Sequence, residues 1–184
     1  MIVCGFRTGL RTGELIGLKW ESINFYDKVI YVQHNVTRGK LTTPKSKASR
    51  RFVRMSNELI KSLEKQRLQV KEWKLKHGWK DMSEWVFPNE EGGFVNYDSF
   101  LKQIWHRAIE KAGMAGKTPY DMRHTYATLR LSAGHLIAEV SKEMGHSSMQ
   151  ITYSTYYKWM PQETRSNIDE LDSARPLFMN AGSK

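Results

Sequence analysis

A short stretch of strand-forming residues inside an otherwise helix-patterned chain limits the possible folds most. Residues 29–37, VIYVQHNVT, are rich in β-branched and aromatic side chains, and the RGK that follows them supplies turn chemistry. Residues 51–55 form a second run of extended character. The two runs predict a small antiparallel sheet near the beginning of the chain.

Most of the remaining sequence has helical spacing of its apolar residues. A first helix is expected around residues 10–20 and another from Ser56 to about Trp73, while PNEEGG at 88–93 is a loop. Later helices are expected over residues 100–112, 121–132 and 135–144, each followed by a glycine, then a short helix capped by Ser147 and a last helix from Pro161. The pattern indicates a mostly helical α+β domain.

The composition favours a polyanionic partner in a reducing compartment. The 184 residues suit one domain with a proper core, and a single cysteine, Cys4, excludes an internal disulfide. No window approaches the roughly 18 continuous apolar residues of a membrane span, and Arg7 interrupts the opening apolar run too early for a signal peptide. The 29 Lys and Arg against 19 Asp and Glu give a formal charge of +10, for which nucleic acid is the first candidate.

Two familiar kinds of catalytic site find little support in the residues. Six histidines are present, but neither HExxH nor paired CxxC occurs, and His124 and His146 lie too far apart to chelate a metal from one helix. No GxSxG motif marks a serine hydrolase. Neither a metal site nor a serine nucleophile is therefore expected.

What remains is a set of cations and a phenol suited to phosphodiester transesterification. Arg11 is followed by Glu14 at helical spacing, and Arg123 opens a later helix. Each alone is ordinary, because surface ion pairs and helix-terminal arginines are common. Together, two forked guanidinium groups can clasp the non-bridging oxygens of a pentacoordinate phosphorus, a tyrosine can attack, and a lysine such as Lys45 can protonate the leaving oxygen.

The chain contains four stretches in this order: TGLRTGELIGLKWESINF, TPKSKASRRFVRM, YDMRHTYATLRLSAG and MGHSSMQITYSTYY. They resemble the first motif, the lysine hairpin, the second motif and the last motif of the catalytic domain of the tyrosine recombinases, the lambda-integrase-like phage and mobile-element integrases. The resemblance spans residues 6–158 and implies an α+β fold, mostly helical, with a small three-stranded antiparallel sheet near the N-terminus. It implies these roles: catalytic Arg11, Lys45 (with Lys47 as a rival), Arg123 and His146, and supporting Glu14, Tyr120 and His124, the last a neighbour held in the core.

The resemblance also selects the nucleophile among three tyrosines. The family's spacing from the histidine of the last motif is nine or ten residues, and Tyr156 occupies the tenth position after His146. Tyr153 is expected to pack inward, and Tyr157 to point about a hundred degrees away if the helix continues.

The chain departs from the family pattern in two ways. Tyr120 stands where the family usually has a histidine, so that His146 or water becomes the candidate general base. Met1 falls almost at the first motif, so the core-binding and arm-binding domains are expected to be absent, in an isolated catalytic fragment or a truncated gene product. Residues 1–174 are then the catalytic domain, and residues 175–184 a flexible or trans-docking tail.

The implied activity is site-specific recombination of double-stranded DNA through a 3′-phosphotyrosyl link. No metal or nucleotide cofactor is expected, nor a membrane. The implied partners are an attachment site and, in the full-length protein, a homotetramer on DNA, in the bacterial or phage-infected cytoplasm at the nucleoid. Three alternatives stay open at this point: a non-catalytic DNA-binding or assembly remnant of an integrase, a type IB topoisomerase-like enzyme, and a helix-turn-helix regulator.

Overall fold

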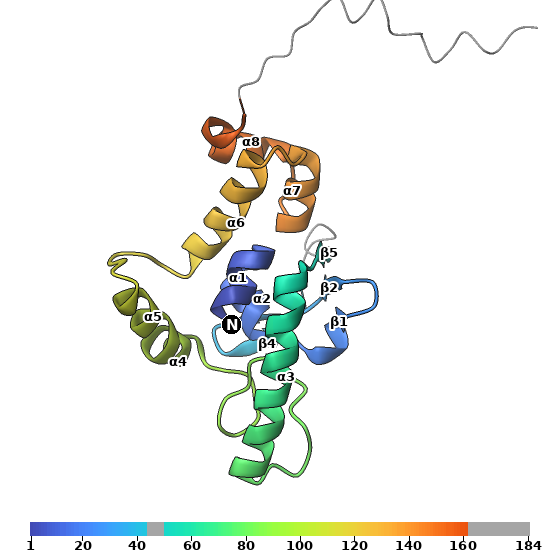
Figure 1. The fold of residues 1–184 in the computed structure, drawn as a ribbon, viewed down its shortest axis with the longest axis vertical. Helices are drawn as coiled ribbons and strands as arrows, with labels where there is room; N and C mark the ends of the chain where they lie inside the picture. Colours follow the sequence, from blue (N-terminus) through green and yellow to red (C-terminus); the bar gives the residue numbers. More distant parts are fainter. Residues whose placement is uncertain (44–49, 162–184) are drawn as a thin grey trace, which may run out of the picture.

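A computed structural model describes residues 1–43 and 50–161 of the chain. A long helix, α3 (Asn57–His77), runs along the molecule beside the short helices α1 (Ile2–Thr8) and α2 (Thr12–Ile16) and the small sheet (Figure 1). The segments α4 (Tyr97–Ser99), η3 (Phe100–Trp105) and α5 (His106–Lys111) lie to one side of it. Three helices gather at the opposite end: α6 (Tyr120–Ser132), α7 (Ile137–Met144) and α8 (Met149–Tyr156), followed by the 3-10 turn η4 (Tyr157–Trp159).

The expected three-stranded antiparallel sheet is confirmed, with one correction to its strands. Its order is β1 (Ile23–Asn24), β2 (Val29–Val32) and β5 (Arg51–Arg54), and Val32 of β2 pairs with Arg51 of β5. The run 29–37 is not one strand, because it breaks after Val32 and continues as β3 (Asn35–Thr37), which pairs with β4 (Lys40–Thr42) in a separate two-stranded ribbon.

The break has a packing reason at α2. The backbone of β3 approaches Gly13 so closely that a Cβ there would lie 2.5 Å from the carbonyl oxygen of Val36. Val36 is buried in the main core, and β3 packs against α2. The ribbon then turns through Arg38 and Gly39, both with positive φ.

The beginning of the chain differs from the expected single helix over residues 10–20. The chain forms α1 first, and Gly9 ends it in the left-handed conformation with φ of 63°. Arg11 is then extended, with ψ of 151°, and α2 spans only five residues before Gly17. The glycines divide the segment, so Arg11 becomes the N-cap of a short helix.

The later helices agree with expectation apart from their ends. Ser56 caps α3 by accepting from the backbone N–H of Leu59, and α3 continues four residues beyond Trp73. The helix expected from residue 135 begins at Ile137, and the cap of α8 is Ser148 in place of Ser147. The helix expected from Pro161 onward and the tail 175–184 lie outside the described residues.

Helix α6 joins two hydrophobic clusters. Met122 belongs to the larger cluster with α1, α2, the sheet and α3, whereas Tyr126, Ala127 and Leu131 pack with α7 and α8 in a second cluster that includes Tyr156. The intervening Arg123 therefore sits at the junction of the two. In the part of the chain that the structure describes, no helix is long and apolar enough to cross a bilayer.

Candidate active site

The N-cap of α2 orients Arg11 between an acidic side chain and the end of α7. The Glu14 carboxylate accepts from the Arg11 backbone N–H at 2.8 Å and from its Nη1 at 3.0 Å. Nη2 of Arg11 donates to the carbonyl oxygen of Gly145 at 3.2 Å. The side chain is still 38% exposed, so it is oriented and accessible to a ligand.

Arg123 reaches the same place from the first turns of α6. Its Nη1 donates to the carbonyl oxygen of Gly9 at 2.7 Å and its Nη2 to that of Met144 at 2.5 Å. Among the described residues its buried Nε–H has no hydrogen-bond partner. Burial and the charges of Arg11 and Arg51 lower the pKa of Arg123 to about 10, which leaves it cationic near pH 7.

A third arginine, Arg51 on β5, lies in this cluster and was not singled out from the sequence. Its Nη1 and Nη2 each donate to one Glu14 oxygen at 2.9 Å, and its Nε donates to the carbonyl oxygen of Glu143. Burial alone would raise the pKa of Glu14, but the bonds and charge of Arg51, with a smaller effect of Arg11, bring it below its ordinary value. Glu14 is therefore an anion shared by two arginines.

The sequence did carry a signal for Arg51. Residues 51, 53 and 55 of the extended run face the core, and residues 52 and 54 are exposed, so a charge stands in register with the buried positions. A charged residue at a core-facing strand position needs a buried partner. The dense basic composition of residues 38–54 hid that pattern.

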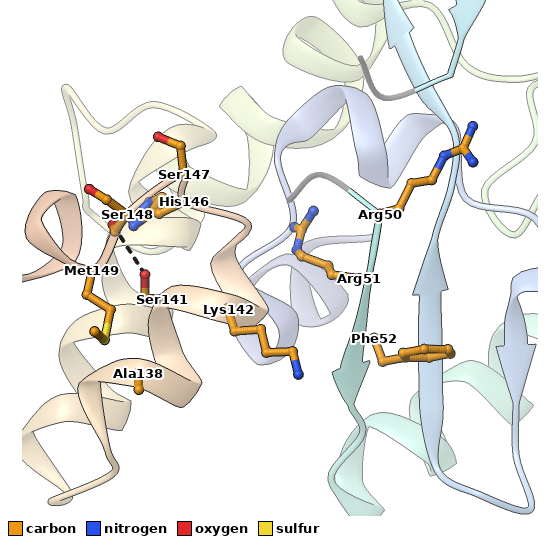
Figure 2. A pocket seen from close by; sticks show the side chains of 10 residues that line it. All are labelled: Arg50, Arg51, Phe52, Ala138, Ser141, Lys142, His146, Ser147, Ser148 and Met149. Carbon is orange, nitrogen blue, oxygen red and sulfur yellow. Dashed lines mark hydrogen bonds between the residues drawn. The ribbon is translucent and has the colours of Figure 1, made fainter. Parts of the chain in front are cut away.

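His146 follows the C-terminus of α7 and borders a hollow of about 600 Å³. Figure 2 shows β5 on one side of this hollow and the loop from α7 to α8 on the other, with Lys142 projecting between them. Nδ1 of His146 is 2.7 Å from Oγ1 of Thr152. Burial, and then the charges of Arg123, Arg11 and Arg51, lower the pKa of His146 to about 4, so its ring is neutral near pH 7.

Tyr156 ends α8 with its ring buried. Its hydroxyl is 2.8 Å from Nδ1 of His124, and the phenol is 2% exposed. Burial raises the pKa of Tyr156 to about 12, although the charge of Arg123 opposes that rise. Arg123 is bound to the carbonyl oxygen of Met144, two residues before His146, and its charge acts to lower the pKa of both His146 and Tyr156.

His124 is a correction to the sequence analysis, which expected it to be held in the core. It is partly exposed and lies between two phenols, with its ring centroid 4.8 Å from that of Tyr120 and 5.7 Å from that of Tyr156. Tyr120 and His124 are four residues apart on α6, so both project toward α8. Tyr120 is 48% exposed at the edge of the site.

The other tyrosines of α8 and η4 stand apart from the cluster. Tyr153 is 52% exposed, so the expectation that it packs inward is wrong. Tyr157 is 56% exposed, and its ring centroid lies 6.0 Å from that of Tyr153. Position 156 is the one that turns toward α6, because residues 152 and 156 form the buried face of this helix.

Two further expectations are not decided by this geometry. Lys45 and its rival Lys47 lie outside the described residues. Over residues 1–43 and 50–161, no three His, Cys, Asp or Glu side chains are grouped as metal ligands. The metal-free reaction stays a prediction.

Comparison with known proteins shows to which family the chain belongs. The sequence profile described as "Phage integrase family" matches residues 1–163. The chain belongs to the phage integrase family. A tyrosine recombinase XerC-like protein from Caldanaerobacter subterraneus subsp. tengcongensis is 30% identical over 94% of this chain and 48% of its own length. A putative defective protein, IntQ, from Escherichia coli K12 is 28% identical over 93% of this chain and 47% of its own length.

A solved structure confirms the fold. The Tn1549 transposon integrase in complex with circular intermediate DNA superposes with a TM-score of 0.69 at 22% identity, over 94% of this chain and 58% of that one. The chain thus spans about half the length of the curated relatives named here. The resemblance to tyrosine recombinases and the mostly helical α+β class with a small antiparallel sheet, both expected from the sequence, are confirmed.

Proposed function

We propose that this chain is the catalytic part of a site-specific DNA recombinase that cuts and rejoins double-stranded DNA through a 3′-phosphotyrosyl intermediate on Tyr156. The observation that carries the proposal is the meeting of two distant arginines. Arg11 and Arg123 donate to the carbonyls of adjacent residues, Gly145 and Met144, and the charge of Arg123 acts on the phenol of Tyr156. Membership of the phage integrase family supports the same chemistry.

Arg11, Arg123 and His146 are the proposed ligands of the scissile phosphate. Forked guanidinium groups pair with the two non-bridging oxygens, whose charge grows as phosphorus becomes pentacoordinate. His146 is neutral near pH 7 because its pKa is about 4, and the bond from Nδ1 to Thr152 leaves Nε2 as its second hydrogen-bonding atom. The histidine then contributes a hydrogen bond and the two arginines contribute the charge.

Tyr156 is the proposed nucleophile. As its oxygen bonds to phosphorus, the bond from phosphorus to the 5′ oxygen breaks, the phenol loses its proton, and Lys45 protonates the departing oxygen. In the reverse direction a 5′ hydroxyl of the partner strand displaces the tyrosine. The hydrogen bond between Tyr156 and His124 adds His124 to His146 and water as candidates for the base.

The proposed partners follow from the family and from the sequence. The formal charge of +10 favours DNA, and the Tn1549 integrase was solved with circular intermediate DNA. For the full-length protein we propose a homotetramer on two attachment sites, in which residues 175–184 dock on a neighbouring subunit. The proposed location is the bacterial cytoplasm at the nucleoid, with residues 1–174 as the catalytic domain.

A nicked duplex that loses a short 5′-hydroxyl fragment after cleavage tests this function, because the broken strand cannot be rejoined. The native chain should form an SDS-resistant protein–DNA adduct on the attachment-site duplex. Tyr156→Phe should form none, whereas Tyr157→Phe should react at the native rate as the matched control. An adduct that persists in Tyr156→Phe would reject the assignment, and no adduct in the native chain would reject the catalytic function.

A second candidate function is non-catalytic DNA binding by an integrase remnant. It is favoured by the similarity to IntQ, described as a putative defective protein, and by the burial of the Tyr156 phenol. This candidate predicts sequence-indifferent binding that weakens about 10³-fold between about 50 and 200 mM salt if about six phosphates are contacted. The nicked duplex separates the two functions, since a remnant binds it without forming an adduct.

A further inference from the structure

Three arginines from three separate segments hold the C-terminus of α7. The carbonyl oxygen of Glu143 accepts from Arg51, that of Met144 from Arg123 and that of Gly145 from Arg11. The last carbonyls of a helix have no intrahelical partner and carry the negative end of its dipole. Cations on successive carbonyls therefore satisfy this end of α7 and fix its direction.

The end of α7 leads directly into the proposed phosphate site. His146 is the next residue after Gly145, and its backbone N–H still donates back to the carbonyl oxygen of Ser141 at 3.1 Å. Gly145 is itself left-handed, with φ of 66°, so the chain turns sharply there. Any displacement of this turn moves the His146 ring and the carbonyl to which Arg11 is bound.

Arg51 differs from the other two arginines in how its guanidinium group is held. Its side chain is 2% exposed, against 38% for Arg11. Arg123 is equally buried, but it donates to two backbone carbonyls, whereas the fork of Arg51 holds both oxygens of the Glu14 carboxylate. Glu14 in turn holds the backbone N–H and Nη1 of Arg11. Arg51 thus connects β5 to the end of α7 and, through one carboxylate, to Arg11.

We propose that Arg51 is a positioning residue of the reaction, which sets Arg11 and His146 for the phosphate without binding the phosphate itself. The inference rests on the proposed function, since the phosphate is that of the DNA substrate. The competing explanation is a buried ion pair that only stabilises the fold. A positioning role and a purely structural ion pair predict different effects of substituting Arg51. They differ in the cleavage rate of the folded variant and in which backbone amides exchange faster.

The kinetic consequences can be stated for two variants. Arg51→Lys keeps one charge but cannot place two parallel donors on Glu14 and a third on the Glu143 carbonyl. We expect cleavage at saturating DNA to slow about 10-fold in Arg51→Lys and about 100-fold in Arg51→Met, the size of effect that misplacement of reacting groups produces. Because no phosphate contact is lost, DNA affinity and its salt dependence should stay native. Removal of a phosphate-binding arginine should instead reduce the slope of log affinity against log salt by about 0.9.

The experiment combines single-turnover adduct formation on the nicked duplex with amide hydrogen exchange of the DNA-free chain. Arg54→Lys, exposed on the same strand, is the control and should match the native chain in both measurements. In Arg51→Lys and Arg51→Met, exchange should rise at least 10-fold at the amides of Gly145 and His146, while the buried amide of Val70 in α3 stays protected.

The outcomes test the positioning role of Arg51 separately from the proposed recombinase function. Local exchange at residues 145 and 146 together with slower cleavage supports the positioning role. If the native chain forms no adduct, the proposed function fails. The exchange pattern alone then decides whether Arg51 holds the C-terminus of α7 in place. Unchanged exchange at these amides, exchange raised equally at Val70, or cleavage by either folded variant at the native rate would each overturn the role of Arg51.

Discussion

The low pKa of His146 makes acid stability sensitive to one side chain. Burial and the charges of three arginines lower this pKa to about 4, against about 6.5 in an unfolded chain. The unfolded state therefore binds the proton more readily than the folded state. The resulting contribution to stability is fully present above about pH 6.5 and is lost as the pH falls toward 4.

The size of the effect follows from the two pKa values. One unit corresponds to about 1.4 kcal/mol, and most of the difference is expressed by pH 4.5, so His146 should remove about 2 kcal/mol of unfolding free energy between pH 7 and pH 4.5. That loss is large beside the roughly 5–15 kcal/mol that stabilises a typical domain. Other titrating groups also contribute, so the effect must be isolated by a variant.

Urea unfolding of the native chain and of His146→Asn isolates the contribution of His146 to the pH dependence of stability. Asparagine keeps a polar atom near Thr152 but does not titrate. Between pH 7 and pH 4.5 the native chain should lose about 2 kcal/mol more than the variant. An NMR titration of the His146 ring in the DNA-free chain should give a midpoint near 4.

Two results would refute the reasoning about this histidine. One is a ring midpoint of 6 or higher, and the other is an equal loss of stability in both proteins. Either would mean that burial and the arginine charges do not lower the pKa of His146 as the geometry requires. The role of a neutral hydrogen-bonding histidine at the phosphate would then have to be abandoned.

Four other substitutions have defined outcomes. Glu14→Ala should lower the unfolding free energy by about 3–5 kcal/mol in urea, because it leaves a buried arginine without its anion; a loss below about 1 kcal/mol would contradict this. Gly9→Ala should cost about 2–4 kcal/mol, since φ is 63° and the new Cβ would lie 2.4 Å from Cδ1 of Tyr126. In Gly39→Ala, φ is 70° but the new Cβ would have no atom within 4 Å, so the loss should be only about 1–2 kcal/mol. Equal losses in Gly9→Ala and Gly39→Ala would speak against the clash between the new Cβ at position 9 and Tyr126. Lys45→Ala should slow cleavage of an ordinary duplex about 100-fold or more but leave cleavage of a 5′-thio leaving group, which needs no proton, near the native rate; equal slowing of both would argue against a proton donor.

The sequence predicted the class of fold because its strongest local patterns agree with the structure. The β-branched residues of 29–32 form the central strand β2, and the alternating residues of 51–54 form β5 beside it. Glycines follow the ends of α5, α6 and α7 close to where they were expected. The start of the chain was harder to predict. Its division into α1 and α2 depends on Gly9 adopting φ of 63° and on tertiary packing of α1 against α6, neither of which is visible in a local pattern.

The candidate site was predictable where the motif order carried it and not where tertiary contacts did. Arg11, Glu14 and Arg123 stand out by motif, and the structure brings them together. The involvement of Arg51 and the contact of His124 with Tyr156 depend on β5, α6 and α8 meeting in space. Tyr153 was misplaced because one turn of an amphipathic helix does not reveal which side meets the core.

The most direct test of the account is to locate the covalent link itself. The native adduct on the nicked duplex is digested with nuclease and protease, and tandem mass spectrometry finds the residue that carries the remaining nucleotide. The account predicts a 3′-phosphonucleotide on the oxygen of Tyr156. A nucleotide on Tyr153, on Tyr157 or on a serine, or a link through a 5′-phosphate, would contradict it.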